Sequence, residues 1–440
     1  DELGTPMIEL TKEQIEKFQR YAPDIVKQVN ESIVNKSNQA RKLQIAKDQS
    51  RFLQLYDKFT HFIKLNQTTI LPSFHIRNKT SNTFNNWLEI GVDAVNVDFQ
   101  KKAFQAMKNG GDVDGILKVI YSDGNIGGIE WSEIYRLAKE YEVIDDGFFA
   151  KDIGAGAMSE GLFKNVKKGL DPTDTKNFIP YQKGAEIGGL IENQDKLIHF
   201  ASQLSRGMNV EDAAESVHKA LFDYSDLTAF EQSTMKRIFP YYTWLRKNST
   251  YQLKQLLEHP ERFALVAKVV HGIQNMVDEE DQMDKDYVND FAQDWVQTPF
   301  NTTNEEGRQE PVLWSTNLPY MDIGRIPDPT NPINSLKELF TQTNPLIKVP
   351  VEQLINRNVF FDSPIVKEGD SQLNRVDHLL SQHGAYPIIK GAIQKDGADL
   401  ALHTLNATTG IKALSYDYDK YKSMKIKELV EKEKKKNKKK

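Results

Sequence analysis

The sequence contains no cysteine among its 440 residues. That absence excludes disulfides, thiolate metal ligands and a cysteine nucleophile. No run of about 18 apolar residues occurs, so the usual length rule predicts no membrane-spanning helix. The first four residues, Asp1 to Gly4, include two acids and lack the basic region of a signal peptide. The chain starts on Asp1 instead of Met, which indicates either removal of the initiator Met or, as we expect, processing from a longer polypeptide.

The motifs of common enzyme and metal sites are also missing. The nine histidines include no His-Glu-x-x-His pair, and no Gly-x-Ser-x-Gly elbow occurs. The glycines at 154 and 156 lack the Gly-Lys-Ser/Thr ending of a phosphate loop. We therefore expect no enzyme activity, no cofactor, no metal and no small-molecule substrate. The alternative is chemistry in a neighbouring module, or in a cleft that the sequence does not reveal.

The composition indicates a folded chain with much solvated surface. Apolar residues make up 39% of the sequence and charged residues 27%, which is too apolar for a disordered chain. The length exceeds what one hydrophobic core reaches, so we expect two or three units. The net charge is −5, but charge is unevenly distributed along the chain, because residues 425–440 contain nine lysines and only three glutamates.

Apolar residues recur at spacings of three and four along much of the chain, a pattern that predicts amphipathic helices. The predicted fold is mainly α, an elongated multi-helix assembly with a Gly-rich linker and a Pro-rich extended arm. Within this arm we expect short helices, such as 333–341 and 351–356. Five regions follow from this reading: an N-terminal helical region 1–108, a Gly-rich mobile linker 109–190, a central helical domain 191–297, a Pro-rich extended arm 298–373, and C-terminal helices with a basic tail 374–440.

Local signals place several helix ends. Asn209 precedes two acids and predicts a helix start, and Thr228 with Glu231 forms a capping box. Pro72 disfavours helix at the residue before it, so we expect an irregular corner over 69–78. The apolar stripe that begins at Phe263 and Val266 predicts a tight helix–helix seam.

Two segments are candidate contacts with anionic partners. The first is a short basic amphipathic stretch, which we interpret either as a mobile linker or as a membrane-surface contact; it comprises Leu162, Phe163, Val166, Lys167 and Lys168. The second is the lysine tail, either a solvated helix end or a contact with nucleic acid or an anionic surface. Its lysines are Lys434, Lys435, Lys436, Lys438, Lys439 and Lys440.

The strongest local feature is a crowd of aromatic residues around one proline, flanked by basic residues. Three interpretations stay open: a buried helix corner, a subunit interface rich in Tyr, Trp and Arg, or a membrane-interface anchor. The candidate residues of this aromatic corner are Phe239, Pro240, Tyr241, Tyr242, Trp244 and Arg246.

The stretch from Phe239 to Asn248, FPYYTWLRKN, preceded by Phe222 to Thr228 and by Glu231, resembles a pattern of phage polyvalent proteins. These are long polypeptides that carry a helical polyvalent-protein-associated domain. Three further stretches are similar to the same family: Leu71 to Asn78, Asn344 to Asn358, and Thr409 to Lys412. The resemblance implies a virion setting and no particular reaction. No catalytic residue is implied by it.

From this resemblance we expect a bacteriophage structural protein, most simply an internal virion protein that leaves the capsid with the DNA. Expected partners are portal or capsid proteins, further copies of the chain, phage DNA through the basic tail, and the host membrane. The expected location is the capsid interior or portal vertex, with the host cytoplasm during assembly. The alternatives are a fixed minor head or head–tail connector protein, and a module of a multi-enzyme polyvalent protein.

Overall fold

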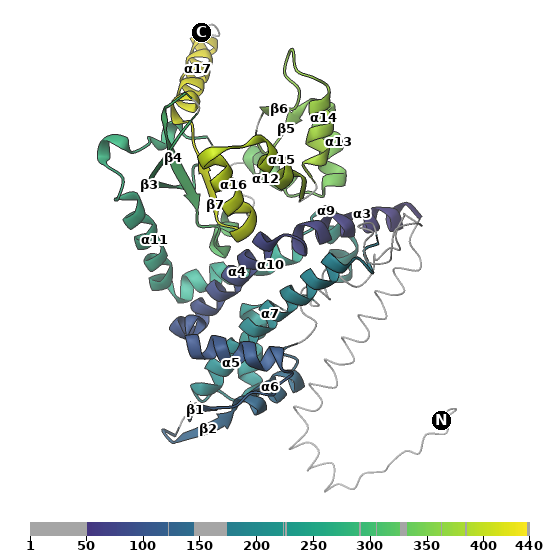
Figure 1. Ribbon diagram of the computed structural model, residues 1–440, viewed down its shortest axis with the longest axis vertical. Helices are drawn as coiled ribbons and strands as arrows, with labels where there is room; N and C mark the ends of the chain where they lie inside the picture. Colours follow the sequence, from purple (N-terminus) through teal and green to yellow (C-terminus); the bar gives the residue numbers. More distant parts are fainter. Residues whose placement is uncertain are drawn as a thin grey trace. The chain divides into compact units, whose positions relative to one another are not determined.

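The computed structural model shown in Figure 1 confirms a mainly helical protein with few short strands. It describes residues 51–121, 123–144, 174–222, 224, 227–289, 292–304, 306–325, 332–361, 363–382 and 385–437. The chain divides into two compact units, Asp1–Tyr56 and Asp57–Lys440. Helix α3 (Arg51–Thr68) begins in the first unit, and the other described helices and strands belong to the second.

The larger hydrophobic core lies among the helices that precede residue 260. Buried apolar side chains from Leu65 to Tyr251 form one continuous cluster, with Leu88, Trp131 and Phe200 fully enclosed. Helices α4 and α7 pack along each other through its centre. The elements here are α3 (Arg51–Thr68), α4 (Pro72–Ile90), η1 (Gly91–Val95), α5 (Val97–Lys108), β1 (Ile116–Ile120), β2 (Ile126–Glu130), α6 (Trp131–Glu140), α7 (Ile179–Ser205), α8 (Val210–Ala220), the π-helical turn η3 (Glu231–Met235), α9 (Lys236–Ile238) and α10 (Tyr242–Glu258).

A second, smaller core lies beside an antiparallel sheet with strand order β3–β4–β7. Leu313 pairs with Leu414 across β4 and β7, and it is buried with Val288 and Tyr416. The elements are η4 (Glu279–Asp281), η5 (Lys285–Tyr287), β3 (Val296–Thr303), β4 (Gln309–Ser315), β7 (Lys412–Ser415) and α17 (Tyr418–Asn437). Strand β7 therefore reaches this sheet from a distant part of the chain.

The remaining elements have few buried apolar residues. They are α11 (Pro260–Gln274), η7 (Pro319–Arg325), α12 (Pro332–Thr341), α13 (Pro345–Ile355), β5 (Arg357–Asn358), β6 (Ser363–Pro364), α14 (Leu373–Leu380), α15 (Ala385–Gln394) and α16 (Gly397–Thr409). Short strands β5 and β6 pair as a hairpin.

The predicted helix caps are confirmed. The Asn209 side chain accepts a hydrogen bond of 2.8 Å from the backbone N–H of Asp212. Glu231 accepts from the backbone N–H of Thr228 at 2.8 Å, and the Thr228 hydroxyl accepts from the N–H of Glu231 at 3.3 Å. These signals are local in sequence, so they could be read without knowledge of the packing.

The corner expected over 69–78 is wrong beyond Leu71. Leu71 is extended, as Pro72 requires, but Pro72 is the first residue of α4. A proline is well accommodated there, because the first helical N–H has no intrahelical partner. The proline starts the helix instead of interrupting it.

Two expected irregular regions also contain regular structure. The linker predicted over 109–190 includes the β1–β2 hairpin, α6 and the start of α7, while residues 145–173 lie outside the described part. The arm predicted over 298–373 contains the short helices expected there, as α12 and α13, but it also folds back on itself as the β3–β4 hairpin. Pro299 lies at the register shift of edge strand β3, and Pro332 and Pro345 stand in first helical turns, where proline is tolerated. Pro311 lies in the central strand β4 and Pro350 inside α13.

The tight seam expected along α11 is absent, since no residue of α11 is buried. Phe263 and Val266 pack against the margin of the larger core, while Leu265 and Val269 are exposed. The apolar pattern identified the helix correctly but not the extent of its packing.

Candidate functional site

Asn344 fastens the start of α13 to the end of α9, directly before the aromatic corner. Its backbone N–H donates to the carbonyl oxygen of Ile238 at 2.7 Å. Its side-chain amide donates to Thr60 Oγ1 at 2.7 Å and to the carbonyl oxygen of Arg237 at 3.1 Å. Its Oδ1 accepts from the N–H of Leu346 and caps α13. Because Asn344 is fully buried, these bonds determine where α13 begins.

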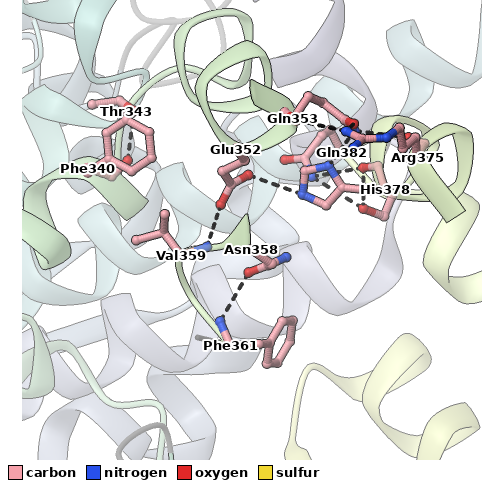
Figure 2. A network of polar contacts seen from close by, with 11 residues as sticks. Phe340, Thr343, Glu352, Gln353, Asn358, Val359, Phe361, Arg375, His378 and Gln382 are labelled. Atoms are coloured by element: carbon pink, nitrogen blue, oxygen red, sulfur yellow. Dashed lines mark hydrogen bonds and ion pairs between the residues drawn. The ribbon is translucent and has the colours of Figure 1, made fainter. Parts of the chain in front are cut away.

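A polar seam joins α13 to α14 (Figure 2). His378 Nε2 lies 3.1 Å from a carboxylate oxygen of Glu352, and both side chains are buried, at 7% and 1% exposure. The Gln353 amide nitrogen lies 3.1 Å from His378 Nδ1. An amide N–H₂ can only donate, so Nδ1 accepts and the ring proton on Nε2 lies toward the carboxylate. Glu352 and His378 therefore face each other in a buried place, but Glu352 Oε2 and His378 Nε2 make no hydrogen bond among the described residues.

Two further bonds extend this seam. Arg375 Nη1 donates to the carbonyl oxygen of Gln353 at 2.7 Å and to its Oε1 at 3.1 Å. The other Glu352 oxygen accepts from the backbone N–H of Val359 at 2.8 Å, which ties the β5–β6 hairpin to α13. The three elements are therefore joined by polar groups.

The outer faces of the two helices are apolar. Successive helical residues are rotated by about 100°, so Ile347, Val351 and Leu354 form one stripe on the side of α13 opposite the seam. By the same geometry, Leu373, Val376 and Leu380 form a stripe on the side of α14 away from His378. All six side chains are exposed, Leu354 by 85% and Leu373 by 72%. We call this arrangement the inverted helix pair, because its polar groups lie between the helices and its apolar groups outside.

More exposed apolar groups continue from the inverted helix pair. Phe360 and Phe361, in the β5–β6 hairpin, contact edge to face with ring centres 4.9 Å apart. Across residues 345–394, nine large apolar side chains expose half or more of their surface: Leu354, Ile355, Phe360, Phe361, Leu373, Val376, Leu379, Ile389 and Ile393. Summed over these nine side chains, the exposed apolar surface is on the order of 1,000 Å².

Helix α15 is held to α14 through Asp377. Lys390 Nζ contacts both carboxylate oxygens at 2.6 Å, and the Tyr386 hydroxyl donates to one of them at 2.7 Å. These bonds, from Lys390 first and Tyr386 second, lower the pKa of Asp377 below its ordinary value. The position of α15 therefore also depends on polar contacts.

The aromatic corner contributes mainly to packing. Pro240 is buried, and the Trp244 ring packs edge to face on Phe222 with centres 5.5 Å apart. Trp244 Nε1 donates to Asp322 Oδ2 at 2.9 Å, which connects α10 to η7. Phe239 is half-buried at the end of α9.

The remaining corner residues reach neighbouring elements. The hydroxyl of Tyr242 donates to Glu231 at 2.8 Å, and Arg246 lies 3.1 Å from the same carboxylate. Tyr241 is partly exposed, and its hydroxyl donates to Gln67 Oε1 at 2.6 Å. All six predicted residues are thus placed, and Tyr241 and Arg246 are the more exposed ones.

Two of the four stretches that suggested a phage polyvalent protein meet in the fold. Gly410, at φ +71°, lies against the backbone of Ser73 so closely that a Cβ would overlap its carbonyl oxygen. Asn344, the first residue of a third stretch, bonds the carbonyl oxygens of Arg237 and Ile238, which directly precede the fourth stretch at Phe239.

A cluster of buried charges between α4 and α7 was not predicted from the sequence. Lys79 Nζ lies 2.5 Å from Asp195 Oδ1, and Lys196 lies 3.2 Å from Glu192. Burial raises the pKa of Asp195 to about 6, opposed by Lys79. Such clusters carry no periodic signal, because a buried polar helix face looks like a solvated one in the sequence.

His199 belongs to this buried cluster. Its Nδ1 lies 2.9 Å from Asn86 Oδ1 and its Nε2 lies 2.8 Å from Ser216 Oγ. Burial lowers its pKa to about 3, assisted by the charge of Arg206. The side chain is fully enclosed, so the neutral ring acts as a hydrogen-bonding link between helices.

The other predicted contact residues are only partly described. The amphipathic stretch with Leu162, Phe163, Val166, Lys167 and Lys168 lies outside the described residues. Lys434, Lys435 and Lys436 belong to helix α17, where Lys434 is exposed. Lys438, Lys439 and Lys440 also lie outside the described part.

Within the described ranges, no helix is long and apolar enough to cross a membrane. The same residues contain no group of three or more His, Asp or Glu side chains placed to hold a metal ion. Comparison with protein-family models, curated proteins and solved structures finds no match for this chain.

Proposed function

We propose that this chain is a structural protein of a bacteriophage particle, an internal component that leaves the capsid with the DNA. The observation that carries the proposal is the inverted helix pair. Apolar stripes on two outer faces are unfavourable in water, and they become favourable when other proteins cover them. A chain that exposes them is suited to assembly.

The phage setting of the proposal comes from the resemblance of the four stretches. The contact of Gly410 with Ser73, which joins two of them, supports it, because a shared structural framework requires its residues to meet. The end of α9, directly before the corner, holds α13 through Asn344, so it also positions the proposed assembly surface.

Ejection requires a chain that unfolds and refolds readily. The two hydrophobic cores are separate, and residues 345–394 are held largely by polar contacts. Units with little apolar core open at low free-energy cost. This construction supports passage of the chain through a narrow channel.

The buried charges near Asp195 favour a second candidate, a module with chemistry of its own, because strongly shifted pKa values cluster at active sites. Asp195 and His199 are fully enclosed, however. A substrate would reach them only if α4 and α7 separated. We therefore favour a structural role for this cluster.

Quantitative mass spectrometry of purified virions, before and after DNA ejection, tests the proposal. We expect the chain in intact particles and its loss from emptied ones. Retention in emptied particles at a symmetric copy number would instead identify a fixed connector protein. Absence from intact particles would contradict the proposal.

A further inference from the structure

The two apolar stripes of the inverted helix pair point in opposite directions. Glu352 and Gln353 of α13 face α14, and His378 and Arg375 of α14 face α13. The stripe of each helix lies on the side away from its partner helix. One flat partner could therefore cover one stripe but not both.

We propose that further copies of this chain cover both stripes, with the α13 stripe of one copy packed on the α14 stripe of the next. Such head-to-tail contact is heterologous, so it propagates and forms a ring when the rotation closes. The inference rests on the proposed assembly role of this surface and names its partner.

The shapes and sizes of the stripes fit helix-to-helix packing. Each stripe has apolar residues at spacings of three and four, which is the pattern that interlocks with a second amphipathic helix. The exposed apolar side chains of residues 345–394, which include Leu354, Leu373 and Val376 of the stripes, sum to on the order of 1,000 Å², against about 800 Å² per partner in a stable interface. Two half-sized contacts per copy, repeated around a ring, reinforce one another.

The charge of this region also fits contact between identical copies. Residues 345–396 contain six Lys and Arg and six Asp and Glu, so the formal charge is 6 − 6, or zero. Identical neutral surfaces do not repel each other. An anionic membrane surface, by contrast, attracts basic segments, and a membrane plane meets only one side of the pair.

Sedimentation velocity of the full chain and three variants tests the inference. Leu354→Glu charges the α13 stripe and Leu373→Glu charges the α14 stripe, while Leu257→Glu, on α10 and 84% exposed, is the matched control. Circular dichroism confirms that each variant is folded. We expect the unmodified chain and Leu257→Glu to form oligomers larger than dimers with rising concentration, and each stripe variant alone to stay monomeric.

The decisive sample is an equimolar mixture of the two stripe variants. Each retains one intact stripe, complementary to the other's, so the mixture forms a one-to-one dimer. Three outcomes overturn the inference. The first is an unmodified chain that is monomeric, and the second is a mixture that stays monomeric. The third is an effect of only one of the two stripe variants, which is the result expected if two copies pair through the same stripe. If the unmodified chain is monomeric and floats with phosphatidylserine vesicles, and Leu354→Glu abolishes this binding, the partner of the α13 stripe is a lipid surface instead.

Failure here is distinguishable from failure of the proposed function. A monomeric chain that is present in virions and lost on ejection leaves the proposed function intact. An oligomer that is absent from virions contradicts the proposed function alone.

Discussion

His199 shows how burial converts a titratable residue into a structural one. Its pKa is about 3 in the folded protein, against an ordinary value of 6.5. Between these pH values the unfolded chain binds a proton that the folded chain does not. The stability of the folded protein must therefore decrease as the pH falls from about 6.5 toward 3, by up to roughly 1.4 kcal/mol per pH unit.

We predict that His199→Gln removes this dependence. Urea denaturation at several pH values between 7 and 4 measures the free energy of unfolding. Below pH 6.5 the unmodified protein should lose stability relative to the variant by about 1 kcal/mol per pH unit. Parallel pH profiles of the two proteins would contradict a buried neutral histidine.

Asp195 should give a pH dependence of stability that is opposite in sign to that of His199. Its pKa is raised to about 6 from an ordinary 3.8, so the folded state holds a proton that the unfolded state releases. Its contribution is complete below about pH 3.8 and is lost as the pH rises through about 6. We therefore predict that, as the pH rises from about 3.8 to about 6, the unmodified protein loses stability relative to the Asp195→Asn variant.

At the residue scale, predictability from sequence depended on distance along the chain. The cap at Asn209 and the Thr228–Glu231 box involve partners three residues apart, so the pattern alone identified them. His199 is bonded to Asn86, which is 113 residues away. Nothing local marks such a pair.

Two glycines of α7 offer a comparison at the scale of elements. A Cβ at Gly184 would overlap the backbone of Thr69, whereas nothing lies within 4 Å of a Cβ at Gly189. Gly184→Ala should destabilise the protein by about 2 kcal/mol, because helix α7 must move from its neighbour. Gly189→Ala should leave stability unchanged or raise it by up to about 1 kcal/mol.

Thermal and urea denaturation of both glycine variants test this pair. Equal effects of the two substitutions would show that Gly184 does not mark a close approach between α7 and Thr69. The comparison is internal to one helix, so differences in general helix propensity cancel.

Glu231 joins two helical elements around the aromatic corner. Despite burial, which raises its pKa, bonds from Thr228 and Tyr242 and the charge of Arg246 hold the pKa of Glu231 below its ordinary value. Glu231→Ala should cost about 2 kcal/mol, since it removes the cap and leaves buried donors without acceptors.

Glu133→Ala, on the exposed face of α6, is the control for Glu231→Ala. Glu133 bonds Arg136, and both side chains are exposed, so little change in the denaturation midpoint is expected. A similarly small effect of Glu231→Ala would mean that the corner does not depend on this carboxylate.

At the element scale, the sequence predicted helices better than their boundaries and better than strands. Pro72 was read as a break because proline both ends and starts helices. The β3–β4 hairpin was missed because its residues include Pro299 and Pro311, which suggested extended chain without pairing. Strand β7 depends on a long-range partner in β4.

At the scale of the whole molecule, the mainly helical class followed from periodicity. The inverted helix pair could not be predicted, because an apolar stripe shows only that a helix has two faces. Which face turns inward depends on the partners that Glu352 and His378 find across the seam. For the same reason, the apolar stripe of α11 could not show whether that face of the helix is buried in a tight helix–helix contact, and no residue of α11 is buried.

The most direct test of the assembly surface is its accessibility inside assembled particles. Because the chain has no cysteine, Leu354→Cys and Leu257→Cys each introduce a single thiol, one on the α13 stripe and one on α10. We predict that a maleimide labels both thiols readily in the isolated protein at a concentration low enough to keep it monomeric, and that only the thiol at position 354 becomes protected in intact virions. Equal labelling of both positions in virions would contradict the account.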